Sequence, residues 1–392
     1  MSNTRIIIAG IFFLIVGMGC KTQQPIRVQH IRNLEAGHTL QGFYYALPRT
    51  VLSIDIVVVK TEETPGPFAQ YASRFLSLEN VISTPSTIFE IREVKINSFA
   101  EPDPAEFYFV ELDLNKNQKN PFSLHASESG LISAVNAPFD EQEFLMSMSE
   151  TRKYGYFGTE ATFNYFLESG LQEKVDTIIQ YIQVDTMTVE RRNLRRRMVE
   201  KSSEIRAREV ADYIMKLREK KFDLISGFAE IPYSKEALQY MYDQMKNQEN
   251  DYLELFTGIT TQTVMSYRFY YIPEKNTAGI PHTLFYFSEK EGVLNEEKSG
   301  SFKLEIEAAR SNITRQLGVF IMNPERNKKA DTGFFYRVPE HANITVRKGT
   351  APLADSRLLV NQYGIITSLP PNDLKIEFYP NTGSIKSVEK IK

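Results

Sequence analysis

A short phrase, in which aromatic residues run into a proline, occurs near both ends of this chain. Residues 42–48 read GFYYALP and residues 333–339 read GFFYRVP, while a looser copy, RFYYIP, occupies residues 268–273. Aromatic residues favour strands, and proline cannot donate a hydrogen bond to a strand ladder. The phrase therefore predicts two β units built to a similar plan, in which each aromatic strand ends at its proline, Pro48 or Pro339.

A second phrase also recurs, with a glycine followed by aliphatic residues at a fixed spacing. It reads SESGLISAV at 127–135, NQYGIITSL at 361–369 and PNTGSIKSV at 380–388. Glycine readily adopts positive φ, so each copy is interpreted as the turn and outgoing strand of a hairpin. The pattern is short, and chance similarity among hairpins explains it as well as duplication does.

The rest of the N-terminal half is rich in strand formers. The sequence predicts strands over 51–60, 87–96 and 106–114, and the EPDP segment at 101–104 separates the last two. Residues 68–78 carry apolar side chains at helical spacing and predict one short helix.

The pattern changes to long amphipathic helices in the middle of the chain. Residues 191–227 predict one helix, which ends at Gly227, and residues 234–258 predict a second, with Ser234 as its N-cap and Gly258 after its last turn. Long helices joined by a short connector are expected to pack as an antiparallel pair. The predicted fold class is therefore α+β, with two mainly antiparallel β units and a central amphipathic helical section.

The N-terminus has the features of an export signal. Arg5 precedes an apolar run over residues 6–16, and small residues lead to Cys20, which is the only cysteine. The run is about half of the roughly 20 residues that a membrane-spanning helix needs, so no permanent span is expected. The segment resembles a bacterial lipoprotein signal, although Gly17 stands where leucine is usual, and it predicts lipidation of Cys20. The alternative is an uncleaved anchor with a buried cysteine.

These features predict a division of the chain into five parts. They are a lipoprotein signal peptide (1–19), a tether (20–37), an N-terminal β-rich domain (38–140), a linker and helical section (141–258), and a C-terminal β-rich domain (259–392). Lys21 follows the cysteine, and no acidic residue comes soon after it. Among bacterial lipoproteins, this arrangement implies an outer-membrane protein that faces the periplasm.

The charge balance and the motifs give little support to catalysis. The chain has 46 basic and 49 acidic residues, so nothing in its net charge of −3 points to nucleic acid. It contains no nucleophile elbow, zincin, dinucleotide-binding or P-loop motif, and its five histidines are scattered singly. No metal or cofactor is therefore expected. Acidic groups at 61–63, 101–104 and 139–143 leave open an envelope hydrolase, in which the fold brings two carboxylates together.

Two groups of residues are candidates for binding a partner. One is the RRNLRRR segment, with Arg191, Arg192, Arg195, Arg196 and Arg197, because arginine can hold phosphate or carboxylate groups in a bidentate way. The alternative interpretation is the solvated first turns of the helix. The other group is the aromatic strand residues Tyr44, Tyr45 and Tyr336, which could line a ligand groove or pack in the core.

Several segments, taken in order, resemble an uncharacterised family of Bacteroidota outer-membrane lipoproteins. They are the lipobox, YYALPRT near the N-terminus, GPFAQYASRFL, and the closing PLADSRLLVNQYGIITSLP. The resemblance covers the chain from about residue 38 to its end and implies a lipid-anchored envelope protein with no assigned catalytic residues. The leading interpretation is a non-enzymatic scaffold or accessory subunit of an outer-membrane assembly, export or uptake complex. The alternatives are a hydrolase of glycan or peptide and a glycan-binding or small-ligand-binding lipoprotein.

Overall fold

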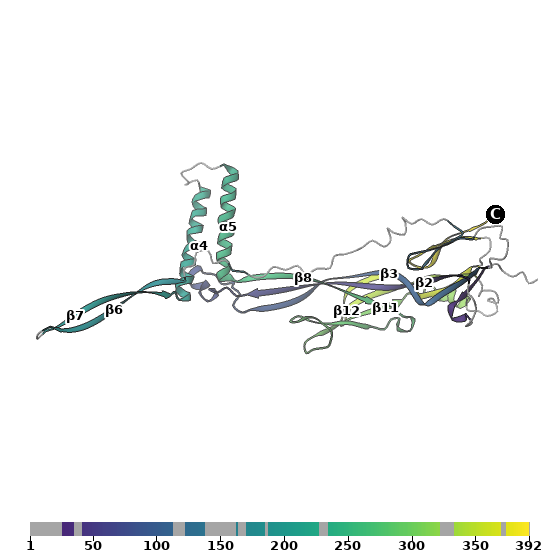
Figure 1. Ribbon diagram of the computed structural model, residues 1–392, viewed down its shortest axis with the longest axis horizontal. Coiled ribbons are helices and arrows are strands. Elements are labelled where there is room, and N and C mark those ends of the chain that lie inside the picture. Colours follow the sequence, from purple (N-terminus) through teal and green to yellow (C-terminus); the bar gives the residue numbers. More distant parts are fainter. Residues whose placement is uncertain are drawn as a thin grey trace, which may run out of the picture.

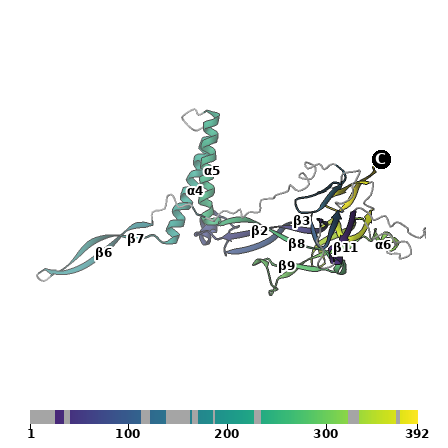
Figure 2. The same ribbon diagram turned by 45° about the vertical axis from the view of Figure 1, so that its right-hand side comes forward.

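The protein is elongated, with β-sheets at one end, a β-hairpin at the other and a pair of helices between them (Figures 1 and 2). The structure is a computed structural model that describes residues 26–34, 41–112, 122–137, 162–163, 170–184, 187–226, 234–321, 333–369 and 374–391. The signal peptide, Cys20 and His38 lie outside these residues. Within the described residues, no helix is both long enough and apolar enough to cross a membrane.

Within the described residues, the strands form four antiparallel sheets. The first has the order β1 (Ile26–His30), β3 (Ser86–Leu112), β2 (Gly42–Thr64) and β8 (Ile259–Tyr271). The second has the order β10 (Gly292–Leu294), β9 (His282–Ser288), β11 (Phe302–Arg310), β12 (Phe334–Lys348) and β13 (Ala351–Leu369). The third has the order β15 (Ser384–Lys390), β14 (Leu374–Tyr379), β5 (Ile132–Val135) and β4 (Leu124–Ala126), and β6 (Leu171–Val184) pairs with β7 (Met187–Glu200) in the fourth.

The helices lie mainly at one end of the long strands. The α-helices are α2 (Ala72–Leu76), α4 (Ser203–Ser226), α5 (Lys235–Thr257) and α6 (Arg315–Ile321), and the short 3₁₀ segments are η1 (Ile31–Asn33), η2 (Ala69–Tyr71) and η3 (Lys275–Thr277). Together with the antiparallel sheets, they confirm the predicted α+β class. The short helix expected over residues 68–78 is also confirmed, as η2 followed by α2.

The first and second sheets face each other across a hydrophobic core. Alternate residues of β2 point to the same face of a sheet, and four of them, from Leu52 to Val58, are fully buried. They belong to one cluster with side chains of β11 and β12, including Ile306 and Ile344. The burial of each such aliphatic side chain contributes about 1.5–3 kcal/mol, so this layer holds the sandwich together.

The two aromatic phrases are strands in different sheets, as predicted, and they pack against each other. The Tyr45 hydroxyl accepts a hydrogen bond from the Phe335 N–H at 2.9 Å, and the rings of Tyr108 and Phe335 stack with centroids 4.5 Å apart. Both phrases therefore contribute to one cluster of buried side chains at the end of the sandwich. The repeat supplies the two halves of a shared core.

The prediction that each phrase ends at its proline was wrong. β2 continues through Pro48 to Thr64, and β12 continues through Pro339 to Lys348. The register of pairing shifts beside each proline, between Ala46 and Pro48 in β2 and around Pro339 in β12. In β12 the shift leaves Pro339 outside the ladder, so a residue without an N–H is tolerated there. In β2 it leaves Leu47 outside, and Pro48 itself is paired with another proline.

β3 is likewise one strand where the sequence predicted two. The EPDP segment lies within it, and Pro102 is directly opposite Pro48. The two residues that cannot donate to the ladder thus face each other at the same irregularity, and the strand resumes on either side. In the third aromatic phrase the strand does stop near the proline, because β8 ends at Tyr271, two residues before Pro273.

Two of the three glycine phrases are confirmed as turns with outgoing strands. Gly130 and Gly383 have φ of +87° and +66° and lie just before β5 and β15. Gly364 instead lies inside β13, opposite the bulge at Pro339, so the turn predicted there was wrong. A Cβ atom at Gly364 would lie 1.9 Å from the carbonyl oxygen of Val338, and close approach of two backbones explains the glycine.

The arginine segment was predicted as helix but is strand. RRNLRRR lies in β7, and α4 begins only at Ser203. The residues of β6 provide an antiparallel partner along the whole of β7, and this cross-strand pairing overrides the local helical pattern. β6 itself was not predicted, although its run of β-branched residues is typical of strands.

The two long helices form the antiparallel pair that the sequence predicted. The Ser234 side chain caps α5 by accepting a hydrogen bond from the Ala237 N–H, and Gly258 follows its last residue. Arg218 and Lys221 of α4 both bond to the buried Glu249 of α5. The base of the pair packs on the short helix α2 in a separate apolar cluster.

Strands from both halves of the chain combine in the same sheets. β8 starts at residue 259, where a C-terminal domain was expected to begin, yet it pairs with β2. The third sheet joins β5 of the N-terminal half to β14 of the C-terminal half. The segments before and after the helices therefore build one sandwich together.

Candidate functional site

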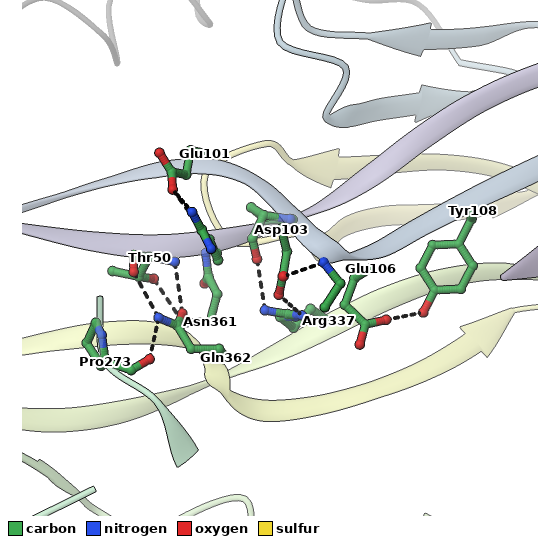
Figure 3. A network of polar contacts seen from close by, with 12 residues as sticks. Thr50, Glu101, Asp103, Glu106, Tyr108, Pro273, Arg337, Asn361 and Gln362 are labelled. Carbon is green, nitrogen blue, oxygen red and sulfur yellow. Dashed lines mark hydrogen bonds and ion pairs between the residues drawn. The ribbon is translucent and has the colours of Figure 1, made fainter. Parts of the chain in front are cut away.

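A network of polar side chains joins the two large sheets beside the proline bulges (Figure 3). β8 pairs with β2 only from Leu52 onward, so Thr50 lies beyond the end of that pairing. The Gln362 side chain of β13 accepts a hydrogen bond from the Thr50 N–H and donates one to the Thr50 carbonyl, both at 2.9 Å. It also donates to the Pro273 carbonyl at 2.8 Å. The amide of Gln362 thus takes the place of a neighbouring strand residue.

Arg337 and Asp103 form a buried ion pair in this network. The Arg337 Nη2 lies 2.9 Å from Asp103 Oδ2, and Nη1 donates to the Pro48 carbonyl at 3.0 Å. Only 3% of Arg337 is exposed. Because a buried charge without a partner is costly, each member of the pair depends on the other. The guanidinium also satisfies a carbonyl at the position where the facing prolines interrupt the ladder.

Glu340 is a second buried carboxylate, with an exposed fraction of 0%. It accepts hydrogen bonds from the N–H groups of Ile313 and Thr314, at 2.9 and 3.0 Å, and from the Thr314 hydroxyl. Burial alone would raise the pKa of Glu340, but these hydrogen bonds and the nearby Arg310 guanidinium favour the ionised form and hold the pKa below its usual value.

Acid should therefore destabilise the protein in part through Glu340. A carboxylate whose pKa is lowered by folding contributes stability above its unfolded pKa of about 4.3, and this contribution is lost as the pH falls through the folded value. We expect Glu340→Gln to lower the melting temperature at pH 7. We also expect the melting temperature of this variant to fall less than that of the wild type as the pH is lowered. Melting temperatures measured from pH 7 to roughly pH 3 test this. Glu289→Gln, at a largely exposed carboxylate, is the control, and equal behaviour of the two variants would contradict the prediction.

The ionised groups of the network bond to one another, which indicates a structural role. Of the acidic segments that a hydrolase could use, the one at 61–63 bonds to Lys60 and Ser86, and the one at 101–104 bonds to Arg49 and Arg337. The segment at 139–143 lies outside the described residues. Within the part of the chain that the structure describes, no three His, Cys, Asp or Glu residues are grouped so as to hold a metal ion.

The three candidate tyrosines differ in their access to a partner. Tyr45 is 1% exposed, and burial raises the pKa of its hydroxyl, so it is a core residue. Burial also raises the pKa of Tyr336, which is half-buried. Tyr44 is 53% exposed and lies against the Phe109 ring. These side chains mainly hold the sandwich together, and only Tyr44 presents most of its surface to solvent.

The five candidate arginines lie together on the β6–β7 hairpin, at the end of the molecule far from the sandwich (Figure 1). The two strands pair from Leu171 opposite Glu200 to Val184 opposite Met187 without a register shift. Directly opposite residues share a face and neighbours alternate, so the hairpin has two distinct faces.

One face, here called the apolar face, carries a continuous series of large hydrophobic side chains. Its residues are Leu171, Val175, Ile179, Tyr181, Leu194 and Met198, all of which are exposed, Tyr181 to 70%. Single exposed hydrophobic residues are ordinary on protein surfaces, but a contiguous series is typical of a contact surface.

The opposite face, here called the basic face, carries Lys174, Arg191, Arg195 and Arg197 with one carboxylate, Asp176. It also carries the exposed hydrophobic residues Ile178, Ile182 and Met187. Arg197 pairs with Asp176 at 2.9 Å, but among the described residues no carboxylate lies within ion-pair distance of Arg191 or Arg195. On the apolar face, by contrast, Arg192 pairs with Glu190 at 2.6 Å and Arg196 with Glu173 at 3.5 Å. The unbalanced positive charge is therefore confined to one side of the hairpin.

A two-stranded hairpin alone in water is at best marginally stable, because neither face has a second layer. Here both faces are exposed to solvent over most of their length. The combination of an unsupported hairpin, an apolar face and two arginines without an ion pair among the described residues makes this element the candidate interaction surface. The arginines were identified from the sequence, but their arrangement on one face follows only from the pairing with β6.

Comparison with known proteins gives a family and no function. A family model described as Domain of unknown function (DUF4831) matches residues 41–386. No curated protein and no solved structure matches the chain. The matched segment includes the sandwich, the helices and the hairpin.

Proposed function

The chain belongs to the DUF4831 family, whose description assigns no activity, and from its sequence and structure we propose that it is a non-enzymatic scaffold or accessory subunit. It is anchored to the outer membrane by lipid at Cys20, faces the periplasm and contributes to an assembly, export or uptake complex. The observation that carries this proposal is the exposed β6–β7 hairpin, which presents an apolar face and a basic face away from the sandwich.

The arrangement along the molecule supports this role. β1, the first described strand, pairs with the last part of β3 in the sandwich, and the hairpin lies at the other end (Figure 1). A lipid anchor that precedes β1 would therefore attach the sandwich end, and the hairpin would extend from it. In this orientation the contact surface lies at a distance from the membrane, where a partner can reach it.

The proposal is tested by photo-crosslinking in native membranes. A photoreactive residue at Leu194, on the apolar face, should capture one defined partner. The same photoreactive residue at Val388, which is exposed on β15 of the third sheet, should not capture that partner. If Leu194 gives no product, or the same products as Val388, in a folded and membrane-bound protein, the hairpin is not the contact surface.

Cys20→Ala serves as the control for the anchor. Each buried acyl methylene contributes about 0.8 kcal/mol to membrane binding, so the variant should appear in the soluble fraction and lose the crosslink. Membrane retention of this variant would contradict the proposed lipid anchor. If one Asp, Glu or His substitution abolished cellular function without affecting folding or membrane attachment, the result would favour an enzymatic function over the scaffold role.

A further inference from the structure

We propose that the hairpin binds its partner by adding a strand to the open edge of β7, and that this strand alternates acidic and apolar residues. The acidic side chains would lie over the basic face and the apolar ones would extend the apolar face. The inference rests on the proposed function, because it names the chemistry of the partner at the same surface.

The edge of β7 is available for such pairing. In the described structure β6 and β7 pair only with each other, so the outer edge of each strand has backbone N–H and C=O groups that no strand satisfies. Unpaired edges of this kind are templates for an added strand, and main-chain hydrogen bonds then provide much of the affinity. The uninterrupted register means that an incoming strand meets a regular ladder.

The charges on β7 specify what the added strand carries. Directly opposite side chains of neighbouring strands lie about 4.5–5.5 Å apart, so a residue opposite Arg191 or Arg195 is within reach of its guanidinium. These two arginines are four residues apart, or roughly 13 Å along the strand, which matches acidic residues at positions i and i+4 of an extended partner. Among the described residues, neither guanidinium lies within ion-pair distance of a carboxylate, and Asp176, which is directly opposite Arg195 on β6, pairs with Arg197 instead.

On the apolar face, the side chains of β7 favour apolar residues in the added strand. There Arg192 and Arg196 already have carboxylate partners, and Leu194 and Met198 are exposed. Acidic residues in the added strand would meet satisfied arginines on this side, whereas apolar ones would cover Leu194 and Met198. An alternating strand therefore satisfies both faces at once.

The same charges disfavour a second copy of this chain at this edge. Pairing of β7 with another β7 would place arginine-rich strands side by side, and like charges directly opposite each other are destabilising. The outer edge of β6 is less selective, because Glu173, Lys174 and Asp176 mix the two signs. An acidic strand at β7 is the occupant that the charges favour.

The test uses a fluorescent peptide of about seven alternating Glu and Val residues and the full-length protein in detergent, with binding followed by fluorescence anisotropy. We expect saturable binding that Arg191→Gln/Arg195→Gln weakens roughly tenfold, since two cross-strand charge pairs are lost. Arg192→Gln/Arg196→Gln removes the same charge from the same strand on the other face and is the matched control. It should change the affinity much less.

Two further peptides separate strand addition from general attraction between charges. A Lys–Val peptide should not bind. A Glu–Val peptide with N-methyl groups on alternate amides should lose binding in the phase that methylates the edge facing β7, because that edge can no longer donate hydrogen bonds. If both methylated peptides bind as well as the unmethylated peptide, or if the two double variants lose affinity equally, strand addition is overturned. Circular dichroism spectra of both variants establish that they are folded.

Other occupants would give different results. A concentration-dependent dimer in sedimentation, lost in the Arg191/Arg195 variant, would identify a second copy instead. Binding to vesicles with roughly 30% anionic lipid, without binding of the Glu–Val peptide, would identify a lipid surface. If the crosslinker at Leu194 captures its partner but the peptide does not bind, the scaffold role stands and strand addition fails. If Leu194 captures nothing, both fail.

Discussion

Replacing Asp103 with alanine should lower the free energy of unfolding by about 3–5 kcal/mol, because it leaves the guanidinium of Arg337 buried without a counter-charge. Urea denaturation followed by circular dichroism measures the loss. The same region provides a control, since Glu101 lies two residues away on β3 and pairs with Arg49 at 2.7 Å near the surface. Partly exposed pairs of this kind contribute up to about 1 kcal/mol, so Glu101→Ala should have a small effect.

A double variant separates lost charge balance from lost packing. Asp103→Leu combined with Arg337→Met removes both charges and keeps most of the volume, and such replacements are often neutral or stabilising. The double variant should therefore be more stable than Asp103→Ala, although it also loses the hydrogen bond to the Pro48 carbonyl. If Asp103→Ala were no more damaging than Glu101→Ala, the ion pair would not hold the two sheets together.

The second large effect is expected at Gly364, where alanine should destabilise the protein by at least about 3 kcal/mol, the upper part of the range for overpacking. All three atoms nearest to the new methyl group belong to the backbone of Val338 and Pro339, at 1.9 to 2.9 Å. Backbone atoms cannot rotate away as a side chain can, so the pairing of β12 with β13 must open at the bulge.

Gly170 provides the matched control for this substitution. It precedes β6, and a Cβ atom built on it meets nothing within 4 Å. Gly170→Ala should change the free energy of unfolding by less than about 0.5 kcal/mol, as is usual at the surface. Thermal melts of both variants give the comparison. A Gly364→Ala protein with the melting temperature of the wild type would show that the backbones do not approach so closely.

The helices were predictable because their signals are local. Ser234 as a cap, Gly258 after the last turn and the apolar spacing of the second long helix all lie within one stretch of chain, and they gave its bounds correctly. The fully buried part of β2 was also evident from its run of β-branched residues. These features depend on neighbours in the sequence.

The errors arose where distant residues decide the structure. Pro48 reads as a strand terminator, but a bulge, Pro102 on the facing strand and the Arg337 side chain, 289 residues away, let β2 continue past it. The RRNLRRR segment has a helical pattern, and no local signal in the sequence indicates that it pairs with β6. The candidate site was likewise predictable only in part. The arginines are evident in the sequence, but their division between two faces depends on the register in which β7 pairs with β6.

The continuity of β2 and β3 also has a mechanical consequence. β2 alone has 23 residues, or about 75 Å at roughly 3.3 Å per residue, and its hydrogen bonds to β3 lie perpendicular to that length. A pulling force along the strands loads those bonds in shear, so that many must break together. A force at right angles would open them one after another. The pair of β2 and β3 is therefore stiff along the strands, which is the direction that separates the sandwich from the helices. This pair can transmit tension between them.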